Sequence, residues 1–159
     1  MNADTSIFPN LQELLIEQSP DAVIFADRTG IIRVWNAAAE RIFGFTKSDA
    51  LGANLNIIIP ENLRDAHWRG FERALVERTT KYAGQVLPTR AVRSDGSQIY
   101  AELSFAIVLD AKGGVLGALA NARDITKRFE KERAERKHLQ ELEKLLDSKA
   151  TSFLDNLNT

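Results

Sequence analysis

Residues Ser19 to Phe45 read SPDAVIFADRTGIIRVWNAAAERIFGF, and this stretch carries the strongest prediction about the fold. Two β-rich runs, Ala22–Ala26 and Ile31–Trp35, surround the turn DRTG and predict a β-hairpin, because aspartate and glycine favour tight turns. Asn36 then stands at an N-cap position and Gly44 at a C-cap position, so a short helix is expected between them. The stretch therefore predicts two antiparallel strands that lead directly into a two-turn helix.

The second half of the chain reads as an antiparallel meander. Three β-rich runs cover Ala83–Arg93, Gln98–Leu109 and Val115–Ile125, and the two loops between them contain aspartate and glycine. Pro88 lies inside the first run and favours an edge strand or a bulge, because proline donates no hydrogen bond to a sheet. Short helical segments and a longer helix at Pro60–Thr79 separate the two groups of strands. This order predicts an α+β fold in which a five-stranded antiparallel sheet carries helices on one face.

A helix is expected on each side of this domain. Residues Pro9–Gln18 begin with proline and place three leucines on one face, which predicts a short amphipathic helix. From Thr126 to about Leu157 the chain predicts one long helix, and 14 of the 23 residues at 127–149 are charged. Its apolar side chains form a partial heptad seam of Leu139, Leu142, Leu146 and Phe153. We therefore expect a homodimer that forms through the N-terminal and C-terminal helices.

The composition fits one domain with two flanking helices, which we assign to residues 19–128, 1–18 and 129–159 respectively. The 21 basic and 22 acidic side chains nearly cancel, which argues against general nucleic-acid binding. The absence of cysteine excludes disulfides, cysteine-ligated zinc, iron–sulfur clusters and a cysteinyl–flavin adduct. The apolar runs are far shorter than the ~20 residues that cross a bilayer, and the N-terminus does not read as a signal peptide. We therefore expect a cytoplasmic protein without a membrane segment.

His67 lies within an apolar stripe of the helix expected at Pro60–Thr79. The small or apolar positions recur at helical spacing and are Leu63, Ala66, Gly70, Phe71, Ala74 and Leu75. The charged residues that surround His67 in the sequence fall on the other face. The spacing therefore predicts that the imidazole points into the domain, where it needs a hydrogen-bond partner or a metal.

The order of elements resembles that of a PAS domain, the common ligand- and signal-sensing module of bacterial regulators. The resemblance rests on the stretch from Ser19 to Phe45, the RSDGS hairpin and the closing triplet Asp124-Ile125-Thr126, and it spans about Ser19 to Arg128. It implies a sheet whose inner face and flanking helices enclose a ligand pocket. It also implies that Asp124, Ile125 and Thr126 relay a signal to the C-terminal helix, and from there to a downstream kinase or regulator.

Within this family, IPENLRDAHWRGF is similar to the proximal-histidine segment of haem-based oxygen sensors. The resemblance implies b-type haem with His67 as the iron ligand, and a neutral imidazole suits iron. Gly70 leaves room for a flat ring beside Phe71, while Leu103 and Phe105 match apolar positions on the distal side. Leu87 aligns with the distal arginine of these sensors, so the resemblance does not extend to that gas-contacting group.

Several alternatives stay open from the sequence. His67 also fits a hydrogen-bonded core histidine in a domain without a cofactor, and the chain then acts as a ligand-free module for protein–protein contacts or dimerisation. Non-covalent flavin near Trp35 and Asn36 is a further possibility, although Asn36 also fits a helix cap. Trp68 falls off the apolar stripe and suggests an interface contact. No catalytic motif is recognisable, so we expect a non-enzymatic sensor, either free-standing or the input part of a larger sensor kinase or transcriptional regulator.

Overall fold

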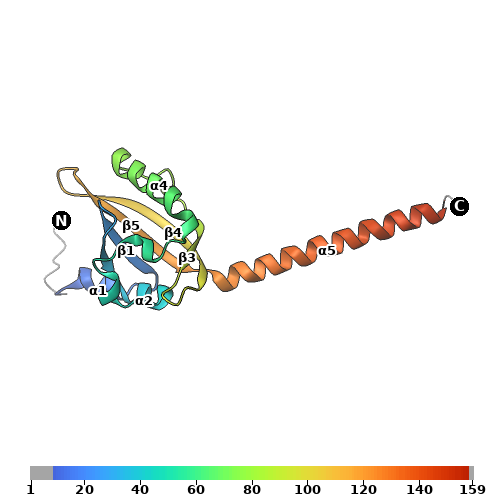
Figure 1. Ribbon diagram of the computed structural model, residues 1–159, viewed down its shortest axis with the longest axis horizontal. Helices are drawn as coiled ribbons and strands as arrows, with labels where there is room; N and C mark the ends of the chain where they lie inside the picture. Colours follow the sequence, from blue (N-terminus) through green and yellow to red (C-terminus); the bar gives the residue numbers. More distant parts are fainter. Residues whose placement is uncertain (1–8, 158–159) are drawn as a thin grey trace. The chain divides into compact units, whose positions relative to one another are not determined.

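The computed structural model describes residues 9–157 (Figure 1). The elements within this range follow the order expected from the sequence. They are α1 (Leu11–Glu17), β1 (Ala22–Asp27), β2 (Ile32–Trp35), α2 (Ala37–Phe43), α3 (Lys47–Ala50), the 3-10 helices η2 (Leu55–Ile57) and η3 (Glu61–Leu63), α4 (Arg64–Glu77), β3 (Leu87–Val92), β4 (Gln98–Leu109), β5 (Val115–Asp124) and α5 (Thr126–Leu157).

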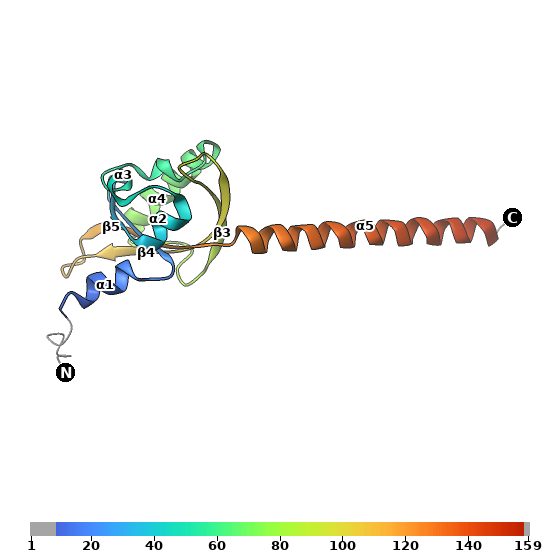
Figure 2. The ribbon, with the colours of Figure 1, turned by 90° about the horizontal axis from the view of Figure 1, so that it is seen from below.

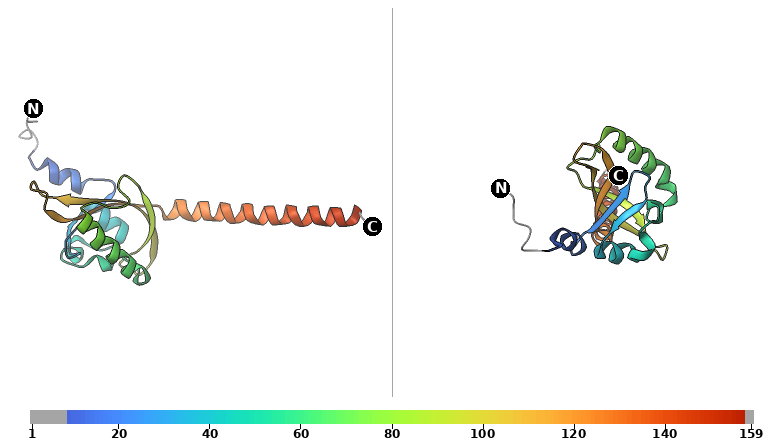
Figure 3. Two further views of the ribbon diagram at one scale, coloured as in Figure 1. Left: turned by 90° about the horizontal axis from the view of Figure 1, so that it is seen from above. Right: turned by 90° about the vertical axis from the view of Figure 1, so that its left-hand side faces the viewer.

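The five strands form one antiparallel sheet in the order β2-β1-β5-β4-β3. The last strand, β5, is therefore central, and it pairs with β1 on one side and β4 on the other. Pro88 lies on β3, an edge strand, as its missing N–H predicts. Helices α2, α3 and α4 lie on one side of the sheet, while the short α1 lies on the other (Figures 2 and 3). The α+β fold expected from the sequence is confirmed.

The turn between β1 and β2 is organised by Asp27. Its carboxylate accepts hydrogen bonds from the backbone N–H and the hydroxyl of Thr29, from the Ile31 N–H and from Arg33 Nε. These bonds, led by the one from the Thr29 hydroxyl, hold the pKa of Asp27 well below its usual range. Gly30 completes the turn with φ +79°, a left-handed conformation that favours glycine. The DRTG turn is thus fixed by one carboxylate.

The side chain of Asn36 forms hydrogen bonds with α1, with the segment at the start of β1 and with α2. Its side chain is 1% exposed, and its carbonyl oxygen accepts from the N–H of Val23 at 2.9 Å and of Ala39 at 3.0 Å. Its amide nitrogen donates to the carbonyls of Ile16 at 2.9 Å and Asp21 at 3.0 Å. The predicted N-cap is confirmed, but the cap accounts for only one of these four bonds. The other three attach the N-terminal segment to the sheet.

The strand expected at Ala83–Arg93 begins four residues later than predicted. Before Leu87 the chain makes two turns, closed by the bonds Ala83 N–H to Thr80 at 3.0 Å and Gln85 N–H to Tyr82 at 2.9 Å. Gly84 has φ +71°, which a regular strand does not contain. These turns were not separated from the strand in the sequence because, unlike the other loops between strands, they contain no aspartate beside the glycine.

The chain divides into two compact units, the first ending at Asp124 and the second starting at Ile125. The second unit consists mainly of the 32-residue helix α5, as expected from the sequence. Two ion pairs at i,i+4 spacing run along it, Arg128–Glu132 and Lys131–Glu135, each 3.8 Å long. Across residues 9–157, none of the helices combines the length and the apolar character that a membrane span requires.

Candidate ligand pocket

The start of α4 is held in place by the side chains of Arg64 and Trp68. The side chain of Arg64 donates to the carbonyls of Ile59 at 3.2 Å and Asn56 at 3.3 Å. One turn later, Trp68 Nε1 donates to Asn56 Oδ1 at 2.9 Å, and its ring fills the space where a Cβ on Gly30 would sit. Trp68 is therefore partly buried against the core of its own domain, and an additional interface contact of this residue stays a prediction. A tryptophan off the apolar stripe can still be buried when a polar partner receives its N–H.

The residues predicted as one apolar stripe of α4 have two different surroundings. Phe71 and Leu75 pack on the core of the sheet, together with Trp68 from outside the stripe. Ala66 and Gly70 are exposed because they border a cavity instead of other side chains. A Cβ on Gly70 would meet no atom within 4 Å. Ala66 and Gly70 therefore form a smooth wall beside open space.

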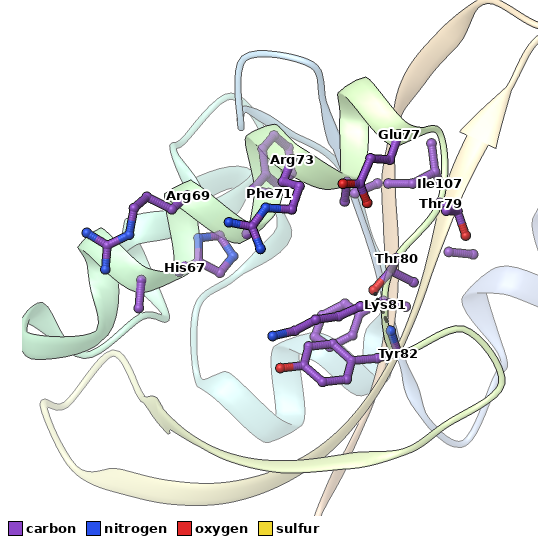
Figure 4. A pocket seen from close by; sticks show the side chains of 16 residues that line it. His67, Arg69, Phe71, Arg73, Glu77, Thr79, Thr80, Lys81, Tyr82 and Ile107 are labelled. Carbon is purple, nitrogen blue, oxygen red and sulfur yellow. Dashed lines mark hydrogen bonds between the residues drawn. The ribbon is translucent and has the colours of Figure 1, made fainter.

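The cavity between α4 and the inner face of the sheet consists of two adjoining hollows of about 430 and 460 Å³. Each is large enough to hold a cofactor or a small ligand. Their shared wall contains Ala66, His67, Phe71, Tyr82, Phe105 and Ala118. The first hollow opens past the C-terminal half of α4 and the loop after it (Figure 4), while the second runs along β3 and the inner face of β1, β4 and β5.

All six residues singled out from the sequence line this cavity. His67, Phe71 and Phe105 border both hollows, Gly70 borders the first, and Leu87 and Leu103 border the second. Leu87 and Leu103 are also direct register partners on β3 and β4. The structure thus brings together residues that lie up to 38 positions apart in the sequence, between His67 and Phe105.

His67 is held between aromatic rings and lacks a hydrogen-bond partner. Its ring centroid lies 4.8 Å from that of Trp68, edge to face, and 6.0 Å from that of Phe71. Nδ1 is buried, and neither ring nitrogen forms a hydrogen bond with a residue in the described part of the chain. Burial lowers the pKa of His67, so the imidazole is neutral at pH 7. A neutral, unpaired imidazole beside a cavity is available to a ligand or a metal.

Basic side chains gather at the first hollow, and reasoning from the sequence missed them. Arg69 and Arg73 lie one turn apart on α4, and Lys81 comes from the loop after it; Glu77 is the acidic side chain among the residues of this wall. In Figure 4 the guanidinium of Arg73 points into the space near His67. The i,i+4 pair of arginines was visible in the sequence, but it was assigned to the solvent face of the helix. The excess of positive charge favours a ligand with acidic groups.

Arg90 also borders the second hollow, although it stands three residues after Leu87 on β3 and therefore at the opposite parity. Burial alternates along β3, where Leu87, Thr89 and Ala91 are more buried than Pro88 and Arg90. Because β3 is an edge strand, a long side chain has room beside it.

At the far end of the sheet, Asp124 connects two elements. It pairs in register with Ala101 of β4, and its carboxylate accepts from Arg93 Nη2 at 2.7 Å. Arg93 starts the loop between β3 and β4, so the ion pair links that loop to the final residue of β5. Ile125 and Thr126 follow directly and begin the second compact unit.

This arrangement of sheet, helices and pocket is matched in known proteins. A family model described as the PAS fold matches residues 11–125. The chain belongs to the PAS fold family. The PAS resemblance stated from the sequence is thereby confirmed, and the match covers every element from α1 to the end of β5.

Curated relatives of this PAS domain include named sensors. Sensor protein FixL of Bradyrhizobium diazoefficiens is 43% identical over 53 residues, which are 33% of this chain and 10% of FixL. Oxygen sensor protein DosP of Escherichia coli strain K12 is 26% identical over 122 residues, which are 77% of this chain and 14% of DosP. An uncharacterized protein of Azorhizobium caulinodans is 36% identical over 121 residues, 76% of this chain and 16% of that protein. The chain thus spans less than a fifth of the length of each of these relatives.

Solved structures agree on the fold. The PAS domain of a Colwellia psychrerythraea protein superposes with a TM-score of 0.64 and 23% sequence identity. The superposition covers 73% of this chain and 95% of that domain. At this identity the likeness concerns the fold alone.

Proposed function

We propose that this PAS domain is a non-catalytic sensor module that binds b-type haem through His67 and passes a change in the haem site to α5. The observation that carries the proposal is His67 itself, a neutral imidazole without a hydrogen-bond partner on the shared wall of the two hollows. Because Nδ1 is enclosed by the protein, Nε2 is the nitrogen through which His67 would bind an iron centre.

The residues around His67 fit haem in shape and charge. Gly70 and Ala66 leave a smooth wall for a flat ring, and a Cβ on Gly70 would fill space that the ring needs. Apolar side chains from β3 and β4, Leu87, Leu103 and Phe105, would face the ring from the other side. The acidic groups of haem would bind Arg73, Arg69 and Lys81 by charge-assisted hydrogen bonds. When bound, haem supplies an iron centre that takes up diatomic gases or changes its oxidation state.

The proposed sensor role is supported by the pairing of β4, which carries pocket residues, with β5, which leads into α5. Leu103 and Phe105 lie on β4, which pairs with β5 along its length and holds Ala101 opposite Asp124. A ligand that shifts β4 therefore acts on Asp124, and Ile125 and Thr126 continue from it into α5. Because FixL and DosP are many times longer than the match, we also propose that the module works as the input part of a larger regulator.

The α5 helix is proposed to pair with a second copy of itself. Its seam residues are exposed within the single chain, with Leu139 at 60% and Phe153 at 65%. Leucines at heptad spacing bury this surface when two helices pair.

The haem proposal is tested by absorption spectroscopy of the full chain after reconstitution with hemin. The wild type is expected to show a Soret band, and His67→Ala to lose or shift it because the iron loses its protein ligand. His138→Ala is the matched control, since His138 is the other of the two histidines and lies on α5. A wild type that takes up no haem, that carries flavin instead, or whose spectrum is the same with and without His67 contradicts the proposal.

A further inference from the structure

Tyr82 stands out because it shares the wall that carries His67. Of the six side chains common to both hollows, four are apolar, and the two polar ones are His67 and Tyr82. The other hydrogen-bond donors of the cavity border one hollow only: Arg69, Arg73, Thr79, Thr80 and Lys81 the first, Thr89 and Arg90 the second. Tyr82 is therefore the donor that faces both hollows together with His67.

The position of Tyr82 is fixed by its own loop. Its backbone N–H donates to the Thr80 hydroxyl at 3.2 Å, and its carbonyl accepts from the Gln85 N–H at 2.9 Å. Lys81 Nζ lies 4.7 Å from the centre of the ring, a cation–π contact that restrains the ring further. In Figure 4 the ring of Tyr82 lies across the pocket from His67, with its hydroxyl directed into the pocket.

The hydroxyl of Tyr82 is free to serve a ligand. It forms no hydrogen bond with any other residue in the described part of the chain, and the residue is only half-buried. A phenol donates one hydrogen bond and binds best to an acceptor that carries negative charge. Oxygen bound to ferrous haem draws electrons from the iron and is such an acceptor, whereas bound carbon monoxide is a much weaker one.

We propose that Tyr82 donates a hydrogen bond that stabilises bound oxygen relative to bound carbon monoxide at this haem site. It does so in place of a distal arginine, since Leu87 provides an apolar side chain at the position that the sequence resemblance assigns to one. The inference rests on the proposed function, because it requires haem on His67.

The test compares oxygen and carbon monoxide binding to the reconstituted, reduced full chain of the wild type and Tyr82→Phe. Loss of a hydrogen bond to a charged acceptor is expected to weaken oxygen binding about 10- to 100-fold. Carbon monoxide affinity should stay within about threefold, and the C–O stretching frequency of the carbon monoxide complex should move as the donor is removed. Tyr100→Phe is the matched control, because Tyr100 is the other of the two tyrosines and lines neither hollow.

The outcomes separate this inference from the haem proposal. A wild type without a Soret band overturns both. A wild type with haem, in which Tyr82→Phe leaves oxygen affinity unchanged or weakens both gases alike, overturns the role of Tyr82 and leaves His67 as the ligand. Thermal unfolding of the variants shows that each is folded before its gas affinities are compared.

Discussion

Replacing Asn36 by aspartate removes two hydrogen bonds and keeps two. The carboxylate can still accept from the N–H groups of Val23 and Ala39, now as an anion near a helix N-terminus. It can no longer donate to the carbonyls of Ile16 and Asp21, which lie 2.9 and 3.0 Å from the present amide nitrogen. Two carbonyl oxygens would instead face a negative charge at a site that is 1% exposed.

The size of the effect follows from these two lost bonds. Each contributes about 0.5–1.5 kcal/mol, and an unpaired buried carbonyl or carboxylate adds desolvation cost. We expect Asn36→Asp to lower the free energy of unfolding by about 2–4 kcal/mol at pH 7. For a domain of this size that corresponds to a fall in Tm of roughly 8–20 °C.

The effect should shrink at low pH. A protonated carboxyl can donate one hydrogen bond, so the folded state binds the proton more tightly than the unfolded state and the pKa of the introduced acid is raised on folding. The free energy of unfolding of the variant relative to the wild type is therefore greatest below the unfolded pKa, about 3.9, falls as the pH rises from there to the raised folded pKa, and is constant above it.

The assay is urea unfolding followed by tryptophan fluorescence, since Trp35 is 1% exposed and adjacent to Asn36. Asn54→Asp is the control, because the side-chain oxygen of Asn54 accepts a hydrogen bond from the Asn56 N–H at 2.9 Å, which a carboxylate can also accept. Hydrogen exchange should show α1 opening first in Asn36→Asp, since α1 contains no buried residue and depends on the bond at Ile16. The reasoning is refuted if both variants are equally stable, or if α1 exchanges no faster.

Two further predictions concern the Asp27 turn and α5. The pKa of Asp27 is depressed by the Thr29 hydroxyl and by further donors that include Arg33, so Asp27→Asn should cost about 1 kcal/mol at pH 7. The difference in the free energy of unfolding between the variant and the wild type should stay constant down to about pH 5 and then become smaller, because protonation of Asp27 removes its hydrogen bonds as an acceptor. Urea unfolding at several pH values measures this difference. A difference that becomes larger in acid would contradict the prediction. In α5, Leu142→Lys should shift the full chain from dimer to monomer in analytical ultracentrifugation, whereas Gln140→Lys, off the heptad seam, should not. Equal sedimentation of the two variants would argue against the seam.

Local patterns in the sequence were enough to predict most of the fold. The DRTG turn, the cap at Asn36 and the boundaries of Gln98–Leu109 depend on neighbouring residues, and all three are confirmed. The late start of β3 was missed because the turns around Tyr82 lack the aspartate that accompanies glycine in the other loops between strands.

Only some of the pocket residues could be predicted from the sequence, for a different reason. His67 and its apolar neighbours follow helical periodicity, which the sequence displays directly. The directions of Arg73 and Trp68 depend on how α4 is rotated over the sheet, and that rotation is set by distant contacts such as Trp68 with Asn56. The direction of Tyr82 depends on the turns of the loop after α4. Periodicity identifies the face of a helix, but it does not say whether that face meets side chains or a cavity.

The central place of β5 also governs how the protein folds during synthesis. Ala22 pairs with Ala122, so β1 cannot complete its pairing until β5, which is synthesised 100 residues later, is available. Until residues 115–124 leave the ribosome, the β1–β2 and β3–β4 hairpins each have an unpaired edge, and such edges associate with other chains. Yield in the cell is therefore expected to depend on how quickly translation completes β5 as well as on the stability of the finished domain.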